Sequence, residues 1–243
     1  MNNPSVSIVI PTYKEVDNIE HLVKSINSSM QGLNCKYEIV IVDDSSEDGI
    51  EALVSMLSKE LPIRIKIRRA ERDLSASVID GFKIAIGDIL VVMDADLSHP
   101  PDKLPELIIP IIEGKCDISI GSRFIKGADI EGFGFFRKAN AIVSKALARP
   151  FVRASDPMSG FFAFRADIIA NYDILKPIGF KIGLEILVKS GTERIVEIPI
   201  IFGKRYAGKG KLSINQQFKY LQHLFRLFLF RIKRQQAVLT CKK

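Results

Sequence analysis

The first half of the chain alternates between short apolar runs and longer stretches in which apolar residues recur at helical spacing. The apolar runs predict five β-strands, at Val6–Pro11, Tyr37–Asp43, Ile63–Arg69, Asp88–Met93 and Asp117–Gly121. Four of these runs are almost continuously apolar, which is typical of parallel strands covered by helices on both faces. The third run alternates apolar and polar residues, which favours a more exposed position at the edge of the sheet.

The stretches between the apolar runs predict helices. Asp17 is a candidate amino-terminal cap for the first helix, with Glu20 three residues later. Pro105 and Pro110 restrict a further helical stretch, Leu104–Ile112, to short or kinked pieces. Alternating strands and helices predict a mostly parallel α/β sheet with right-handed crossovers. In sheets of this kind, ligands bind beyond the carboxyl ends of the strands.

Polar residues follow four of the predicted strands where each strand ends. They are Pro11–Glu15, Asp43–Ser46, Asp94–Asp96 and Gly121–Arg123. Because the strands are predicted to be parallel, these segments should meet at one edge of the sheet. Neither a Gly-x-Gly-x-x-Gly segment after the first strand nor a P-loop motif occurs in the sequence. This argues against a dinucleotide-dependent dehydrogenase and against a P-loop enzyme.

Asp94 and Asp96 form the clearest candidate for a metal site. Residues i and i+2 of an extended chain point to the same side, so both carboxylates can face one ion. Mg²⁺ or Mn²⁺ bound by one or two carboxylates and by substrate phosphates fits this spacing. The alternative is a pair of solvated loop aspartates, and Asp44 at a neighbouring strand end favours the ion, because three acids at one edge repel unless each has a partner. We interpret His99, which precedes two prolines, as a residue that shapes the following turn.

Two basic segments follow in the second half. The segment Phe202–Leu212 contains four cations and three glycines between an apolar strand-like run and a helix. Such a loop suits phosphate binding, and the alternative is a solvated flexible loop. Residues 214–243 predict a basic amphipathic helix. This helix either docks on the core or lies in a membrane interface, and its apolar stripe is wider than one docking face needs.

The composition narrows the possible settings and partners. The chain has 243 residues, 47% of them hydrophobic, which is enough for one large domain with an appendage. Three scattered cysteines fit neither a disulfide framework nor a Cys-x-x-Cys metal site, which favours a reducing cytosolic setting. The net charge of +7 is compatible with nucleic acid, an anionic membrane surface or phosphorylated small molecules. We expect neither a signal peptide nor a transmembrane helix.

Six motifs in this order resemble family 2 glycosyltransferases, and within them the dolichyl-phosphate mannose synthases. The motifs are Pro11–Glu15, Val42–Ser45, Asp94–Asp96, Gly121–Arg123, Ser155–Phe161 and Arg205–Leu212, and the segment Phe180–Glu185 is similar to archaeal members. The resemblance extends from about residue 6 to residue 221. It implies a GT-A fold and a metal-dependent transfer of mannose from GDP-mannose to dolichyl or another polyprenyl phosphate, with inversion.

The same resemblance implies a role for each matching residue. The residues expected to hold the nucleoside are Pro11, Tyr13, Glu15, Val42 and Asp44. Those expected to hold Mg²⁺ or Mn²⁺, the diphosphate and the sugar are Asp94, Ala95, Asp96 and Ser98, with Asp94 and Asp96 as the metal ligands. Those expected to face phosphate groups are Arg123, Arg137, Arg205 and Lys211. Catalysis is assigned to Asp96, Arg123 and Arg205.

We therefore expect a catalytic domain at residues 1–213 and a membrane-interfacial helix at residues 214–243. The protein should be peripheral, on the cytoplasmic face of a membrane, and should meet either an anionic membrane surface or a membrane partner. No nucleic-acid partner is implied.

Two alternatives stay open. One is the same reaction with UDP-glucose as the donor, and the other is a non-catalytic subunit that binds lipid phosphate. Processive polysaccharide synthases of the family usually carry a Gln-x-x-Arg-Trp motif, and this chain has no Trp.

Overall fold

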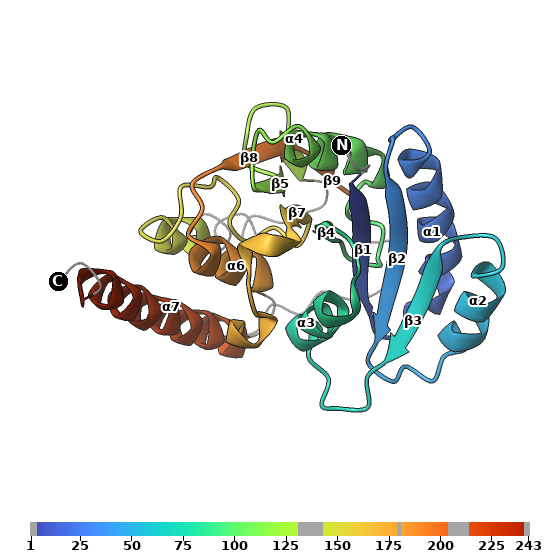
Figure 1. Cartoon of the computed structure of the whole chain (residues 1–243). Coiled ribbons are helices and arrows are strands. Elements are labelled where there is room, and N and C mark those ends of the chain that lie inside the picture. Colours follow the sequence, from blue (N-terminus) through green and yellow to red (C-terminus); the bar gives the residue numbers. More distant parts are fainter. Residues whose placement is uncertain (1–3, 131–142, 179–180, 204–213, 241–243) are drawn as a thin grey trace.

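The computed structural model describes residues 4–130, 143–178, 181–203 and 214–240. Its centre is a seven-stranded sheet in the order β3-β2-β1-β4-β7-β5-β8 (Figure 1). The strands are β1 Ser5–Thr12, β2 Lys36–Asp43, β3 Ile63–Ile67, β4 Ile89–Val92, β5 Ile118–Ser122, β7 Phe162–Arg165 and β8 Ile195–Pro199. All of them are parallel except β7, which runs antiparallel to both β4 and β5. A separate short pair joins β6 Asp129–Ile130 to β9 Ile201–Phe202.

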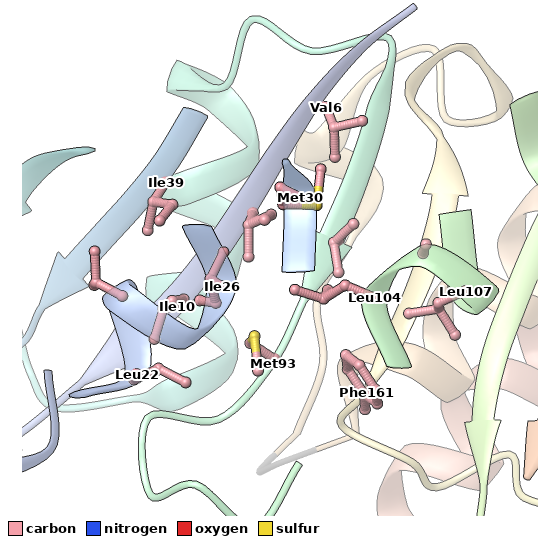
Figure 2. Packing of buried hydrophobic residues seen from close by; sticks show 14 of the residues in the cluster. Val6, Ile10, Leu22, Ile26, Met30, Ile39, Met93, Leu104, Leu107 and Phe161 are labelled. Carbon is pink, nitrogen blue, oxygen red and sulfur yellow. The ribbon is translucent and has the colours of Figure 1, made fainter. Parts of the chain in front are cut away.

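Helices cover both faces of the sheet. On one face lie α1 Val16–Met30, α2 Ile50–Leu57 and α4 Leu104–Ile112, which build the core cluster shown in Figure 2. On the other face lie α3 Leu74–Ile84, α6 Ile182–Ser190 and the amino-terminal half of α7 Ile214–Thr240. Short 3₁₀ turns occur at Pro101–Lys103, Ala166–Ile168 and Tyr172–Ile174. Because both faces are covered, the central strands are apolar along most of their length, as the sequence predicted.

The predicted strands and the predicted parallel α/β sheet are confirmed. The alternating run at Ile63–Ile67 is β3, and it lies at the edge of the sheet. The helix over Leu104–Ile112 contains Pro110, whereas Pro105 stands in its first turn, where a missing N–H costs little. The predicted cap is wrong, because α1 begins at Val16 after Glu15, and Asp17 lies inside the first turn.

The antiparallel strand β7 was not predicted. It lies between β4 and β5, which would otherwise be neighbours in a continuous parallel sheet. Phe162 and Phe164 pack into the core on the α3 and α6 side, while Ala163 faces the α1 and α4 side. The strand brings the preceding segment, Ser155–Phe161, across the carboxyl ends of β4 and β5.

The helix α7 packs on the body of the protein along one face only. Tyr220, Leu224 and Leu227 are buried in the core cluster that α3 and α6 share, and the Tyr220 hydroxyl donates to the Ser144 carbonyl at 2.6 Å. Figure 1 shows α7 leaving the body beyond α6, with the carboxyl end of the helix far from β1 to β3. Large exposed apolar side chains occupy its other face, at Phe218, Leu221, Phe225, Phe228 and Leu229. Among the helices that the structure describes, none is both long enough and apolar enough to cross a membrane.

Candidate active site

The carboxyl ends of β1, β2, β4 and β5 meet at one edge of the sheet, as the sequence predicted. Thr12, the last residue of β1, pairs with Asp43, the last residue of β2, and β4 ends at Val92 on the other side of β1. Because these strands are parallel, the polar segments that follow them share this edge. The candidate site is therefore assembled from segments far apart in the sequence.

The turn after β4 holds Asp96 in a fixed position. One oxygen of the Asp96 carboxylate accepts hydrogen bonds from the Ser98 backbone N–H at 3.1 Å and from the Ser98 hydroxyl at 2.5 Å. Leu97 between them adopts a left-handed conformation, with a φ of 60°. This is an unusual conformation for a residue with a branched side chain, and it marks a tightly constrained turn.

The His99 side chain packs against the same turn and holds its backbone. Its Nδ1 atom accepts a hydrogen bond from the Asp94 backbone N–H at 3.0 Å, and its ring stacks on Phe161 at a centroid distance of 5.3 Å. Phe202 contacts the ring edge-on, at 5.4 Å. Because Nδ1 accepts the hydrogen bond from Asp94, the imidazole is neutral and carries its proton on Nε2, and burial, which lowers the pKa of His99, favours the same form. This geometry agrees with the interpretation of His99 as a turn residue.

The Asp94 carboxylate lies beside a glycine. The Asp94 side chain is 32% exposed. A Cβ atom at Gly160 would lie 3.6 and 3.7 Å from its two carboxylate oxygens, and 3.3 Å from the Cε1 atom of His99. The absence of a side chain at Gly160 therefore keeps the space next to the carboxylate open.

The donor set at this turn fits a cation whose remaining ligands come from a substrate. Within the described ranges, no group of three or more His, Cys, Asp or Glu side chains is arranged to hold a metal ion. Asp94 and Asp96 supply two carboxylates. Mg²⁺ is commonly bound in this way, with the other positions taken by substrate phosphates and water.

Asp44, at the end of β2, has partners within the protein. Its carboxylate accepts hydrogen bonds from Arg68 Nη1 at 2.5 Å, from the Ser77 hydroxyl at 2.8 Å and from the Asp73 backbone N–H at 3.0 Å. Asp44 was predicted to favour an ion at Asp94 and Asp96 as a third acid at this end of the sheet. It does not do so, because Arg68 already compensates the charge of Asp44.

The segment after β1 approaches the same edge. The guanidinium carbon of Arg72 lies 3.7 Å from the centroid of the Tyr13 ring, a cation–π arrangement that the sequence did not reveal. The Lys14 backbone N–H donates to the Ser46 hydroxyl at 2.8 Å, which ties the β1 and β2 segments together. Glu15 accepts a hydrogen bond from the Asn18 side chain at 2.6 Å. Three predicted contact residues, Pro11, Val42 and Ala95, are buried at this edge.

Arg123, after β5, forms a two-pronged ion pair with Asp156. Its Nε and Nη2 atoms donate to the two carboxylate oxygens at 2.7 and 2.8 Å, and its backbone N–H donates to one of them at 3.0 Å. Burial acts to lower the pKa of Arg123, but the hydrogen bond and charge of Asp156 outweigh it and raise the pKa. The Glu197 carboxylate in turn accepts the backbone N–H groups of Ser155 and Asp156, at 2.8 and 3.0 Å. The role of Asp156 as the partner of Arg123 was not predicted.

The remaining predicted phosphate contacts lie outside the described residues. They are Arg137, Arg205 and Lys211. The structure therefore brings together Asp94, Asp96, Ser98 and Arg123 of the predicted set on the β4 and β5 side of the edge. Asp44, Tyr13 and Glu15 lie on the β1 and β2 side.

Two similar curated proteins carry the same name. The chain is 46% identical over 226 residues to the dolichol-phosphate mannosyltransferase of Pyrococcus furiosus, an alignment that covers 91% of this chain and 63% of that protein. It is 37% identical over 239 residues to the dolichol-phosphate mannosyltransferase of Mycosarcoma maydis, covering 95% of this chain and 81% of that protein. The chain thus spans less than two thirds of the length of the Pyrococcus relative.

A solved structure and a family model also indicate similarity to glycosyltransferases. A glucosyl-3-phosphoglycerate synthase from Mycobacterium tuberculosis, solved with Mn²⁺, UDP and glucosyl-3-phosphoglycerate, superposes with a TM-score of 0.67 at 18% identity. That superposition covers 94% of this chain and 80% of the other, and it shows that the two share a GT-A type fold. The model of the glycosyl transferase family 2 matches residues 7–172. The chain therefore belongs to glycosyl transferase family 2.

Proposed function

We propose that this protein transfers mannose from GDP-mannose to dolichyl or another polyprenyl phosphate, with inversion at the sugar carbon and with the help of a divalent cation. The observation that carries this proposal is the similarity to dolichol-phosphate mannosyltransferases over 91% and 95% of the chain. The carboxylate pair at the carboxyl edge of the sheet supports the metal-dependent part. The product is dolichyl-phosphate mannose, a donor for glycosylation.

The donor would lie across both halves of the sheet edge. We assign the nucleoside to the β1 and β2 side, at Pro11, Tyr13, Glu15, Val42 and Asp44. We assign the diphosphate and the sugar to the turn after β4, at Asp94, Ala95, Asp96 and Ser98. Asp94 and Asp96 would hold Mg²⁺ or Mn²⁺, which when bound neutralises the charge that develops on the leaving diphosphate.

The acceptor needs little help from a general base. The second pKa of a phosphomonoester is about 6, so its oxygen is already ionised near neutral pH. In a single displacement, an acceptor phosphate oxygen forms a bond to the anomeric carbon while the bond from that carbon to the GDP oxygen breaks. The protein aligns the two substrates and cancels the repulsion between their phosphates, for which we assign Arg123 together with Arg137, Arg205 and Lys211. The neutral, buried His99 is then a support for the turn.

The carboxyl-terminal helix would bring the site to the lipid. We propose residues 1–213 as the catalytic domain and residues 214–243 as a membrane-interfacial helix, so that the protein is peripheral on the cytoplasmic face. The exposed apolar stripe of α7 supports this assignment, since its basic residues, which include Lys219, Arg226 and Lys233, can meet anionic lipid. A membrane partner is the alternative contact for the same face.

The test is a transfer assay with purified protein, liposomes that contain a polyprenyl phosphate, Mn²⁺ or Mg²⁺, and a panel of nucleotide sugars. We expect transfer from GDP-mannose that stops when a chelator is added. Transfer from UDP-glucose in place of GDP-mannose would make the protein a glucosyltransferase. Retained binding of the lipid phosphate without transfer from any donor would instead indicate a non-catalytic lipid-phosphate-binding subunit.

A further inference from the structure

Lys181 lies where the candidate site meets the carboxyl-terminal helix. It immediately precedes α6, and its ammonium nitrogen is 5.5 Å from the centroid of the Tyr220 ring of α7. The first turn of α6 packs against the loop that carries Asp156, because a Cβ atom at Gly183 would lie 3.0 Å from the Ser159 carbonyl oxygen. The Lys181 side chain is therefore held between the site and α7.

Among the described residues, the surroundings of Lys181 offer its ammonium group no acceptor. Within the part of the chain that the structure describes, its ammonium group forms neither a hydrogen bond nor an ion pair. Lys189, two turns later in α6, is a useful contrast, because it pairs with Glu185 and also donates to the Ile174 carbonyl. The nearby carboxylate of Asp156 is already engaged by Arg123 through both of its oxygens.

The electrostatic balance around Lys181 favours an incoming anion. Burial and the positive charge of Arg123 lower the pKa of Lys181 to about 8, and the negative charge of Asp156 opposes this shift only in part. Among the described residues, the other groups that face it are the Tyr220 ring and His223 on α7, and neither is negatively charged. An anion bound here would relieve the repulsion between Lys181 and Arg123 and would raise the pKa of the lysine.

We propose that Lys181 donates hydrogen bonds to the phosphate of the polyprenyl-phosphate acceptor, which places that phosphate beside Arg123 and next to α7. This inference rests on the proposed function and specifies which residue binds the phosphate of the acceptor lipid. A phosphate dianion can supply the acceptor that this partly buried ammonium, beside an arginine, lacks within the described residues. Because Tyr220 belongs to α7, this placement puts the phosphate next to the helix that we assign to the membrane interface.

The test combines binding, proton uptake and steady-state kinetics on the full chain. Wild type, Lys181→Met, Lys181→Arg and the exposed control Lys115→Met are titrated at pH 8.5 with a detergent-solubilised polyprenyl phosphate, in two buffers of different ionisation enthalpy. The lipid phosphate is fully ionised at this pH, so net proton uptake reports on the protein. Dolichol without phosphate, and inorganic phosphate, separate recognition of the phosphate from recognition of the lipid.

We expect wild type and Lys115→Met to take up a substantial fraction of a proton on binding. Lys181→Met should take up none, should bind the lipid phosphate about tenfold more weakly, and should raise the KM for the acceptor while the KM for GDP-mannose changes little. Lys181→Arg should recover affinity without proton uptake, because arginine is charged throughout. A structural role through the Tyr220 ring would not produce this pattern.

Several outcomes would overturn the assignment. Unchanged acceptor affinity and unchanged proton uptake in a folded Lys181→Met would do so, as would an equal rise of both KM values. Inorganic phosphate binding as tightly as the lipid phosphate would show a site for free phosphate instead. If wild type binds the lipid phosphate with proton uptake but transfers no sugar, the proposed function fails and the Lys181 assignment stands. If wild type transfers mannose and Lys181→Met behaves like wild type, only the Lys181 assignment fails.

Discussion

The two halves of the sheet edge differ in how their charges are compensated. At the ends of β1 and β2, the Asp44 side chain is 4% exposed and accepts from Arg68, Ser77 and a backbone N–H. Beyond the ends of β4 and β5, the Asp94 side chain is 32% exposed, and Lys181 has no ion-pair partner in the described part of the chain. In the first half the buried charges compensate each other, whereas the second half combines one compensated pair, Arg123 and Asp156, with the more accessible charges of Asp94 and Lys181.

Because of this difference, we expect acidic residues in the two halves to have different roles. A buried acid with an arginine partner mainly positions the backbone around it, and removing one member leaves a buried, uncompensated charge. A partly exposed acid next to open space can change partners when a ligand binds. We therefore expect mutations at β1 and β2 to act mainly on stability, and mutations at β4 and β5 to act mainly on the reaction.

The largest effect is expected at Asp96. Asp96→Asn keeps the size of the side chain and its bond from Ser98 but weakens a proposed metal ligand. Transfer should fall by about a hundredfold or more, with little change in the melting temperature. Initial rates across a Mn²⁺ titration measure the loss, and the exposed Asp102→Asn in the next turn is the matched control. Wild-type activity that survives a chelator would remove the metal from the mechanism.

Asp44 tests the other half. Asp44→Asn removes the more buried of the two carboxylates that pair with Arg68, and we expect a loss of about 3 kcal/mol in the free energy of unfolding. Asp80→Asn is the control on the same arginine, since Asp80 accepts from Arg68 Nε at 3.1 Å but is more exposed. Asp80→Asn should lower the free energy of unfolding by at most about 1 kcal/mol. Urea unfolding monitored by circular dichroism distinguishes the two, and equal losses would contradict the contrast between the halves.

Much of the fold, and one part of the site, could be predicted because they follow from local pattern. Four continuous apolar runs and one alternating run identified five strands, and parallel strands bring the segments that follow them to the same end of the sheet wherever the helices pack. The alternation of apolar and polar residues in β3 is also a local pattern, and it identified β3 as an outermost strand of the sheet. The acid pair Asp94 and Asp96 was found because its two residues are two positions apart, so a local rule was enough.

Compensation of charge could not be predicted because it depends on distant parts of the chain. Arg68 meets Asp44 across 24 residues, and Arg123 meets Asp156 across 33. The direction of β7 is likewise set by its pairing with β4 and β5, since a short apolar run is compatible with either direction. Lys181 lies in a segment that contributed to the family resemblance, but its isolation from acceptors is visible only after α6 and α7 pack together.

The face of α7 that packs on the body contains a buried histidine, and the pH dependence of stability can test its environment. His223 Nε2 and Glu185 Oε2 are buried 3.9 Å apart, and within the described residues neither atom has a hydrogen-bond partner. Burial, with the charges of Lys189, Arg226 and Lys181, lowers the pKa of His223 to about 4. Between about pH 6.5 and pH 4 the unfolded chain binds this proton and the folded chain does not, so acid destabilises the fold.

We expect His223 to lower the free energy of unfolding by about 3 kcal/mol at most between pH 6.5 and pH 4. His223→Asn keeps an acceptor for the Ile178 N–H, which His223 Nδ1 now accepts at 3.3 Å, and should flatten the pH dependence. The exposed His21→Asn should leave it as in wild type. Free energies of unfolding from urea titrations at pH 4.5, 5.5 and 7 measure the slope. Parallel slopes in all three proteins would contradict a low pKa at His223.

The smallest effect is expected on the exposed face of α7, which carries several large apolar side chains. Phe225 is 62% exposed and faces away from the buried Leu224 and Leu227, so Phe225→Asp should leave the free energy of unfolding within about 0.5 kcal/mol. Binding to anionic liposomes should weaken by about tenfold, because an inserted aromatic side chain is lost and a negative charge is added. Ile86→Asp, at another exposed apolar position, is the control. Equal sedimentation of both variants with liposomes would indicate that this face meets a protein partner rather than lipid.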